Sequence, residues 1–184
     1  EAATVEERGG NSTYTAGATR LVYNGVEDVT SLVDLSEAEL ANMDFGTYTA
    51  EQYFDDMYRM TRYRTDPELC DILVHNSLPT WQWLKKHGVK FQTSQGRQAF
   101  KVDGKYKFWG GLCIETWGGG HGLVDMEHEI CGKKGIDIRY ETAGVSLLTD
   151  ETGRVTGVKV RHKGRTSDLR AGAVALTRQL VDIE

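Results

Sequence analysis

The stretch GGGHGLVDMEHEICGKKGIDIRYETAGVSLLTDETGRVTGVKV, residues 118–160, decides the fold of this chain. It opens with glycines, continues as a helical segment that ends at Gly135, and then becomes strands on either side of a turn at Thr152 and Gly153. Glycine tolerates the backbone angles of helix ends and tight turns better than any other residue. A helix followed by strands is the order of a crossover unit, so the sequence predicts an α/β fold.

Further strands are expected on both sides of this helix. IDIRY (136–140) reads as a first strand, followed by one strand before the turn and a return strand after it, and DLRAGAVAL (168–176) reads as the last. Upstream, VKFQT (89–93) predicts a short strand. A hairpin is predicted around Asp103 and Gly104, because Asp-Gly is a favoured two-residue turn.

Residues 31–88 have a helical pattern instead. Ser36 with Glu39 three residues later predicts a capping box. Thr49 is a good N-cap for the apolar-periodic segment that follows it.

The longest predicted helix lies within residues 66–88. Asp66 before Pro67 favours a helix start, and Gly88 favours the end. Pro79 is expected to break or kink it, which would make two helices. The side chains expected on its apolar face are Leu69, Ile72, Leu73, Leu78, Trp81 and Leu84.

Length and charge narrow the class of protein. The 184 residues are enough for one domain, or at most one and a half. A net charge of -5 argues against a nucleic-acid partner, which would need a basic stripe. No apolar run approaches the ~20 residues of a membrane helix, so no membrane segment is expected. Three widely spaced cysteines favour reduced thiols and a cytoplasmic location.

Two glycine clusters allow two interpretations each. RGGNS, residues 8–12, is either a surface turn or a backbone cradle for a phosphate-bearing cofactor. The glycines of residues 118–122 precede a helix, so their N–H groups could face an anion, or they could serve as a hinge or allow close chain packing. His121, His128 and Cys131 suggest a metal site, but no second cluster completes a tetrahedral set, and we expect no metal.

Together these motifs resemble a known family. EAATVEERGGNSTYTAGATR (1–20), WLKKHGVKFQ (83–92), the opening stretch and AGAVALT (171–177) occur in the order found in FAD-dependent oxidoreductases. The similarity is to the fumarate reductase and succinate dehydrogenase flavoprotein superfamily, and within it to the tricarballylate dehydrogenase branch. The resemblance implies a partial Rossmann-like FAD-binding domain with a helical segment and a β-hairpin or meander.

The resemblance also implies cofactor contacts. The string from Gly9 to Ser12 would wrap the FAD pyrophosphate, and Glu1 would bind the adenosine ribose. Ala16 and Gly17 would lie against the flavin ring. The backbone at Ala143 and Gly144 would meet the adenine. The full set of implied cofactor-binding residues is Glu1, Arg8, Gly9, Gly10, Asn11, Ser12, Ala16, Gly17, Ala143 and Gly144.

Some of the family's features are missing from these 184 residues. They contain no GxGxxG, and RQLVDIE (178–184) stands where the family has a glycine turn. We therefore expect an interior fragment whose FAD site is half built, with weak or no FAD binding. The catalytic residues of the family would lie outside it.

The expected segments follow from these motifs. They are an FAD-loop segment at 1–30, a helical segment at 31–88, a hairpin region at 89–117, a helix with strands at 118–177 and a non-family tail at 178–184.

Three functional hypotheses remain at this point. The first is an oxidoreductase that exchanges hydride between FAD and a small polycarboxylate. The second is a truncated, inactive α/β module without cofactor, and the third is a metal-dependent hydrolase. Unpaired sheet edges would favour a homodimer in any of these cases.

Overall fold

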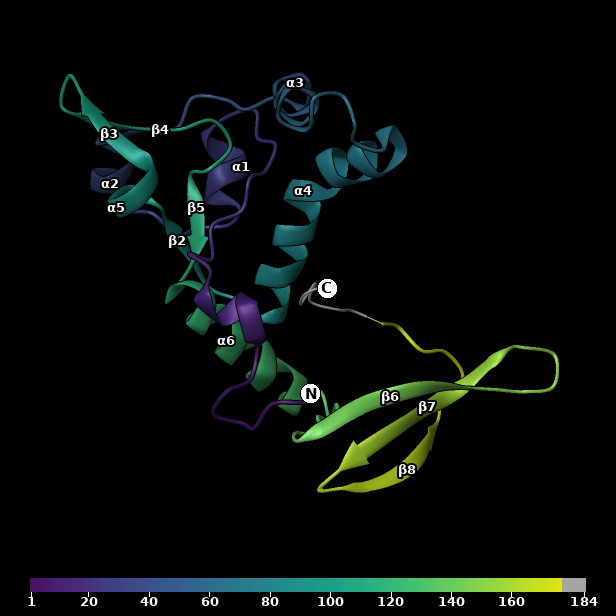
Figure 1. Ribbon diagram of the computed structural model, residues 1–184. Helices are drawn as coiled ribbons and strands as arrows, with labels where there is room; N and C mark the ends of the chain where they lie inside the picture. The colour runs from purple at the N-terminus through teal and green to yellow at the C-terminus, as the bar shows by residue number, and fades with distance from the viewer. Residues whose placement is uncertain (177–184) are drawn as a thin grey trace. The chain divides into compact units, whose positions relative to one another are not determined.

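The computed structural model describes residues 1–176 as two compact units (Figure 1). The central unit comprises residues 14–130, and the terminal unit comprises residues 1–13 together with the chain from Cys131 onward.

Most helices belong to the central unit. Four of them are single turns or little more: η1 is a 3-10 helix that starts in the terminal unit, whereas α1, α2 and α5 are α-helical. The bounds are η1 Gly10–Tyr14, α1 Val26–Thr30, α2 Glu37–Ala41, α3 Ala50–Thr61, α4 Pro67–His87, α5 Gln95–Gln98 and α6 Gly119–Lys133.

The predicted helix caps are confirmed. The Ser36 side chain accepts from the backbone N–H of Glu39, and the Glu39 carboxylate accepts in return from the Ser36 N–H at 2.8 Å. Thr49 forms the same capping box with Gln52 at the start of α3. These motifs form as predicted because a cap depends only on residues three positions apart.

Helix α4 differs from its prediction in two ways. It runs unbroken from Pro67 to His87, although its ribbon changes direction along its length in Figure 1. A single stripe is buried on both sides of Pro79, which offsets the hydrogen bond that proline removes. The buried stripe is Cys70, Val74, Ser77 and Trp81. The predicted apolar face was therefore wrong in its first turns, where Leu69 and Ile72 are more than half exposed.

Two small sheets complete the central unit. Strand β3 (Ala99–Val102) pairs antiparallel with β4 (Lys105–Phe108), and β1 (Met43–Asp44) pairs parallel with β4. The predicted hairpin turn is confirmed, because Asp103 and Gly104 both have positive φ angles, 49° and 83°. Strands β2 (Phe91–Thr93) and β5 (Ile114–Thr116) form the second, antiparallel sheet.

The core of the central unit lies between α4 and these sheets. Its most deeply buried side chains come from segments far apart in sequence: Leu21, Tyr23, Val29, Leu32, Val74, Val89, Cys113 and Ile114. The Tyr23 hydroxyl donates to the carbonyl of Phe45 at 2.8 Å, so the one polar end of this ring is satisfied.

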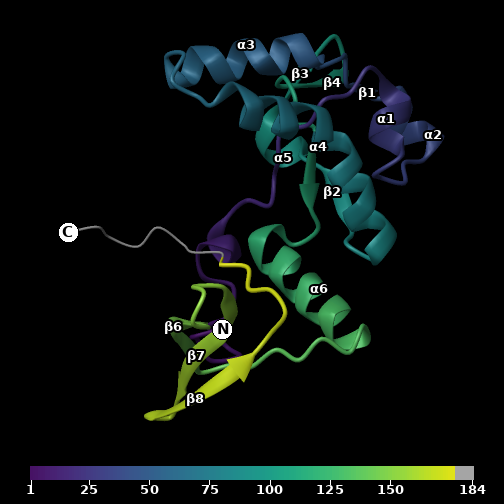
Figure 2. The same cartoon turned by 90° about the vertical axis from the view of Figure 1, so that its right-hand side faces the viewer.

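The terminal unit is built on a three-stranded antiparallel meander, seen from two sides in Figures 1 and 2. Its strands are β6 (Thr142–Thr149), β7 (Val155–His162) and β8 (Arg165–Arg170). The predicted turn at Thr152 and Gly153 joins β6 to β7.

Two strand predictions in the terminal unit were wrong. Residues 136–140 are not a strand: no strand among the described residues pairs with them, and the Arg139 carbonyl accepts from the Glu1 ammonium instead. The last strand spans Arg165–Arg170, earlier than the predicted 168–176, since a turn at Lys163 and Gly164 brings it back onto β7. The predicted tail at 178–184 lies outside the described residues.

Candidate functional site

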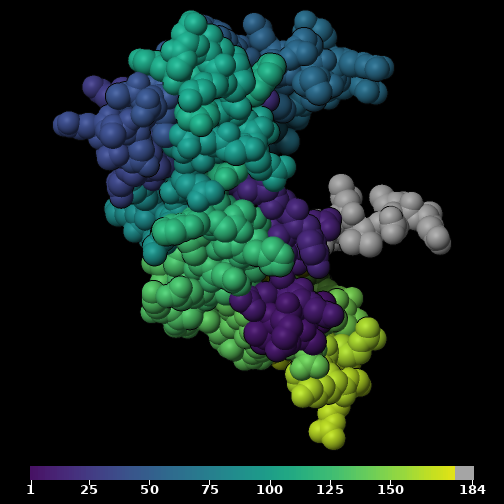
Figure 3. All heavy atoms as spheres, turned by 90° about the vertical axis from the view of Figure 1, so that its left-hand side faces the viewer, coloured from purple at the N-terminus to yellow at the C-terminus, as the bar shows by residue number. Residues whose placement is uncertain are grey.

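The first residues of the chain lie beside the start of β6. The Thr142 N–H donates to the Glu1 carbonyl at 2.9 Å, and the Glu141 N–H donates to the Ala3 carbonyl at 2.9 Å. The Glu1 ammonium donates to the Arg139 carbonyl at 3.1 Å. In Figure 3 these residues, in purple, lie against the green and yellow part of the terminal unit. This pairing fixes Glu1 at the edge of the meander.

The Glu1 carboxylate is held in its charged form. It accepts a hydrogen bond from the Ala3 N–H at 3.0 Å, and this bond is the main reason that its pKa is lowered. The N-terminal ammonium and the Gly9 N–H lower the pKa further. The structure therefore brings together two residues that the resemblance implied, Glu1 and Gly9.

A polar hollow of about 490 Å³ lies next to Glu1 in the terminal unit. Arg139 and Arg170 contribute guanidinium groups to its wall, and Asp137 and Asp168 contribute carboxylates. These four residues were not among the predicted site residues. They are scattered over 34 positions of sequence, two of them before β6 and two in β8, which pairs with β7.

The loop from Arg8 to Ser12 is a tight turn that leads into η1. Gly9 and Gly10 have positive φ angles of 91° and 50°, which only glycine adopts without strain. The Ser12 N–H donates to the Gly9 carbonyl at 3.1 Å, and the Thr13 hydroxyl donates to the Arg8 carbonyl at 2.9 Å. The loop thus has the geometry of a turn, and its two glycines carry no side chain that would cover the backbone.

The predicted adenine contacts lie within β6. Ala143 pairs with Arg161 and Gly144 pairs with Val160, and the register shifts immediately after Gly144. A Cβ at Gly144 would meet only Val158 Cγ2 at 3.9 Å, an ordinary contact. Neither residue borders the hollow beside Glu1.

In the central unit, Ala16 and Gly17 cross the glycine-rich start of α6. The Thr116 N–H donates to the Gly17 carbonyl at 2.9 Å, and the Gly120 N–H donates to the Thr15 carbonyl at 3.0 Å. Gly17 has a φ of +70°, and a Cβ there would stand 2.0 Å from Thr116 Oγ1. The small size of Gly17 is therefore already required by the contact with Thr116.

The glycines at 118–122 are likewise required by close contacts within the chain. A Cβ at Gly122 would lie 1.8 Å from the Trp117 carbonyl oxygen, and its N–H donates to the Gly118 carbonyl at 3.1 Å. Of the two interpretations of this cluster, the contacts favour close chain packing. The His121 ring lies edge-on to Tyr14, with centroids 6.0 Å apart.

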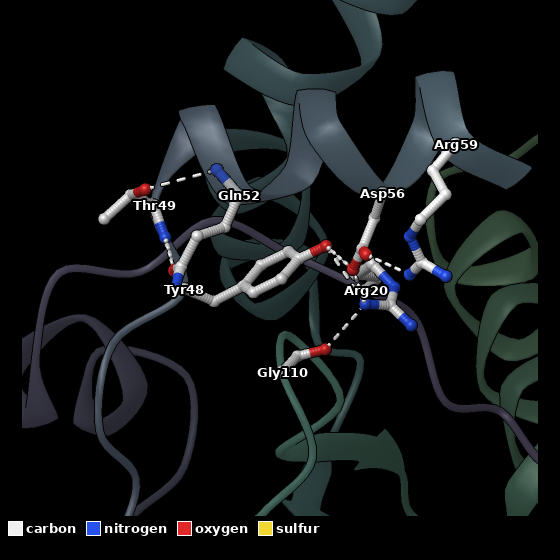
Figure 4. A network of polar contacts seen from close by, with 7 residues as sticks. All are labelled: Arg20, Tyr48, Thr49, Gln52, Asp56, Arg59 and Gly110. Atoms are coloured by element: carbon white, nitrogen blue, oxygen red, sulfur yellow. Dashed lines mark hydrogen bonds and ion pairs between the residues drawn. The ribbon is translucent and has the colours of Figure 1, made fainter. Parts of the chain in front are cut away.

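A network of polar contacts joins four segments of the central unit (Figure 4). Arg20 Nη1 donates to the Tyr48 hydroxyl at 3.0 Å, to Asp56 at 2.9 Å and to the Gly110 carbonyl at 2.8 Å. Asp56 also accepts from Tyr48 at 2.8 Å and from Arg59 at 2.6 Å. The bonds from Arg59 and Tyr48 lower the pKa of Asp56. Burial, together with the bond to Asp56, raises the pKa of Tyr48 to about 12.

Within residues 1–176, no three His, Cys, Asp or Glu side chains are grouped closely enough to hold a metal ion. In the same range no helix has both the length and the apolar character needed to cross a membrane.

FAD fits the terminal unit in part. An ionised carboxylate at Glu1 can accept from ribose hydroxyls, and glycine at positions 9 and 10 places no side chain between the backbone and a ligand. In the central unit, the side of Gly17 where a Cβ would stand is filled by Thr116, so any flavin contact there would use the opposite side of the backbone.

Comparison with known proteins adds the family. Residues 14–180 match the family described as FAD binding domain. The match begins at Tyr14, so Glu1 and the Arg8–Ser12 loop lie before it. The fumarate reductase (cytochrome) of Shewanella frigidimarina is 23% identical over 158 residues, which are 85% of this chain and 24% of the relative. The chain thus spans about a quarter of that curated relative.

Two solved structures are similar in fold. One is a 3-ketosteroid-delta4-(5alpha)-dehydrogenase from Rhodococcus jostii RHA1, with a TM-score of 0.62 and 19% identity, covering 89% of this chain and 36% of that one. The other is the open conformation of a flavocytochrome c3 fumarate reductase, with a TM-score of 0.54 and 22% identity, covering 83% of this chain and 24% of that one. At these identities the likeness concerns the fold alone.

Proposed function

Because this chain belongs to the FAD binding domain family, we propose that it is the flavin-binding part of an FAD-dependent dehydrogenase or reductase. The observation that carries this proposal is the family match over residues 14–180. When bound, the flavin would supply the chemistry by accepting or donating a hydride, and the residues of this chain would bind and orient it.

We further propose a small polycarboxylate as the substrate. Two arguments support this class: the resemblance of the sequence to the tricarballylate dehydrogenase branch, and the similarity to a relative whose name gives fumarate, a dicarboxylate, as its substrate. A steroid is the competing substrate class, because one neighbour in fold is a 3-ketosteroid dehydrogenase.

Each predicted contact has a defined role in this proposal. Glu1 would accept hydrogen bonds from the ribose through its ionised carboxylate. The string from Gly9 to Ser12 would wrap the pyrophosphate, with the Ser12 N–H still bonded to the Gly9 carbonyl, and Ala16 would keep the chain close to the flavin ring. Ala143 and Gly144 would present backbone to the adenine.

The experiment is flavin reduction by the whole protein that contains this chain. Under anaerobic conditions, we expect loss of the oxidised-flavin absorbance with succinate or tricarballylate, and no loss with a 3-ketosteroid. Reduction by the steroid alone would reject the polycarboxylate class but keep the flavoenzyme. A purified protein without flavin absorbance, even after incubation with FAD, would reject both.

Gly10→Val is expected to reduce FAD binding by that whole protein at least tenfold. Valine is strained at the φ of 50° that Gly10 adopts, and its branched side chain would cover the backbone that faces the pyrophosphate. Bound flavin per protein, measured by absorbance after gel filtration, checks this. Gly46→Val is the control, because Gly46 also has a positive φ of 60° but is not among the residues assigned to FAD. Equal flavin content in Gly10→Val and wild type would mean that the loop is only a turn.

The 184-residue chain by itself is expected to bind FAD weakly and to show no dehydrogenase activity. These residues contain no GxGxxG, the turn that supplies the main pyrophosphate contacts in a Rossmann site. Losing two or three charge-assisted hydrogen bonds would weaken binding by roughly 3–9 kcal/mol if their contributions add. Titration of the chain with FAD should therefore give a Kd in the micromolar range or weaker. Stoichiometric FAD that survives gel filtration would contradict this expectation.

We also propose a homodimer that covers the outer edge of β6. Among the described residues, β6 has β7 as its one strand partner, and its other edge is bonded to the first residues of the chain at Thr142 but pairs with no strand beyond it. Sedimentation of the chain at several concentrations tests this, and a monomer at all of them would reject it.

As a location we propose the cytoplasm, on the basis of the three cysteines, which form no disulfide among the described residues.

A further inference from the structure

A second hollow lies in the central unit, where α4 ends and β2 begins. Its volume is about 450 Å³, within the range of small-molecule sites. The floor is formed by Leu32, Val89 and Phe91, which belong to the hydrophobic core and are at most 8% exposed. None of the residues assigned to FAD borders this hollow.

Trp117 forms one wall of the hollow and is unusually exposed for its size, at 59%. Its backbone is fixed on two sides. The Trp117 N–H donates to the Lys90 carbonyl at 3.0 Å, which extends the pairing of β2 with β5, and its carbonyl oxygen packs against Gly122. A large aromatic face is therefore presented to the hollow by a rigid backbone.

Two ammonium groups border the same space. Lys90 Nζ lies 5.5 Å from the centroid of the Trp117 ring. Lys85 Nζ pairs at 3.2 Å with Asp34, which also borders the hollow but whose side chain is 97% exposed. An ion pair this exposed contributes little to stability, so Lys85 can exchange Asp34 for another anion at small cost.

We propose that this hollow binds a small anion with a flat apolar body, such as an aryl carboxylate. The body would lie on the apolar floor and stack against Trp117, and the carboxylate would bind the ammonium groups of Lys90 and Lys85. Mostly apolar lining with a few placed polar groups is the usual composition of a small-molecule site. The proposal is independent of the FAD function.

The chain offers a matched control for these contacts. Lys101 Nζ lies over the Tyr106 ring at the same 5.5 Å, on the β3–β4 hairpin. The hollow beside that pair is bordered by apolar residues, Ala38 and Met43 among them, and by the polar residues Glu39 and Asn42. Lys101 is the one lysine among the described residues that borders it, so it repeats the cation and the ring with a single ammonium group.

The test is binding of 2-naphthoate to the full chain by isothermal titration calorimetry, with 2-naphthalenemethanol as the neutral analogue. We expect saturable 1:1 binding of naphthoate. Binding should be about tenfold weaker for Lys90→Gln, which removes one charge-assisted contact, and weaker still for the alcohol, which removes two. Lys101→Gln should bind as wild type does. Citrate, which has carboxylates but no flat body, should not compete.

Four results would overturn the proposal. They are no saturable naphthoate binding, equal affinity for the alcohol, a loss of naphthoate affinity in Lys101→Gln equal to that in Lys90→Gln, or full competition by citrate. Lys90 is a surface side chain, so Lys90→Gln is expected to keep the fold, and an unchanged thermal unfolding midpoint verifies this. Trp117→Leu adds a second readout, because its loss of affinity should extend to the neutral analogue as well.

Discussion

Gly17→Val is expected to destabilise the central unit by about 3–5 kcal/mol, from left-handed backbone strain, overpacking and a lost hydrogen bond together. Gly17 has a φ of +70°, and its Cβ would stand 2.0 Å from Thr116 Oγ1 and 2.9 Å from the backbone carbon of Gly119. Thr116 is completely buried, and its hydroxyl donates to the Gly119 carbonyl at 2.8 Å. Any shift that makes room for valine therefore breaks this bond or moves the start of α6. Urea unfolding of the two proteins measures the difference.

Two controls separate the contributions at Gly17. Gly46→Ala places a side chain at a positive φ of 60° with nothing within 4 Å, so it measures the backbone strain alone, about 1–2 kcal/mol. Gly96→Ala has neither strain nor close neighbours and should be neutral or slightly stabilising, because Gly96 lies in α5. A cost for Gly17→Val no larger than that of Gly46→Ala would mean that Thr116 adjusts freely.

Asp56→Ala is the second substitution with a large expected effect, about 2–3 kcal/mol of stability at pH 7. It removes the common acceptor of Arg20, Tyr48 and Arg59. The Tyr48 hydroxyl then loses its acceptor, although the Tyr48 side chain is 97% buried. The loss of stability is smaller than for a fully buried ion pair, because the Asp56 side chain is 30% exposed and solvent screens its charge. Asp34→Ala is the control, since that carboxylate is almost fully exposed.

The same substitution carries a pH dependence with a defined sign. The pKa of Asp56 is lowered in the folded state, so the stability that it contributes is present above the unfolded pKa of about 3.9 and is lost as the pH falls through the lower folded value. The difference in unfolding free energy between wild type and Asp56→Ala should therefore shrink between about pH 5 and pH 3. A difference that stays constant over this range would contradict the assigned bonds.

Local signals in the sequence predicted local structure. Asp66 accepts from the N–H groups of Glu68 and Leu69, and Gly88 ends α4 with a φ of 112°, both as expected. Such motifs involve neighbours a few positions apart, so no tertiary information is needed to find them.

The buried face of α4 could not be found in this way. Apolar side chains surround the first half of that helix, and only the packing of the unit selects Cys70 and Val74 over Leu69 and Ile72. The period of the pattern alone could not make that selection.

The polar contacts of the central unit were also beyond sequence reasoning. Arg20 reaches Asp56 across 36 positions and Gly110 across 90, and none of these residues belongs to a recognisable motif. The glycines at 118–122 were recognised, but the choice between anion binding and chain packing depended on Thr15 and Trp117, which only the fold brings close.

The division of the chain into two units has a consequence for the order in which it folds. The bond between Thr116 and Gly17 closes a loop of 99 positions, and the bond between Glu1 and Arg139 closes one of 138. The bond between Thr116 and Gly17 can form before Arg139 has been synthesised. On the ribosome, the central unit would therefore be completed first. The first thirteen residues would wait longest for their partners, an order that pulse-labelled hydrogen exchange on stalled nascent chains would resolve.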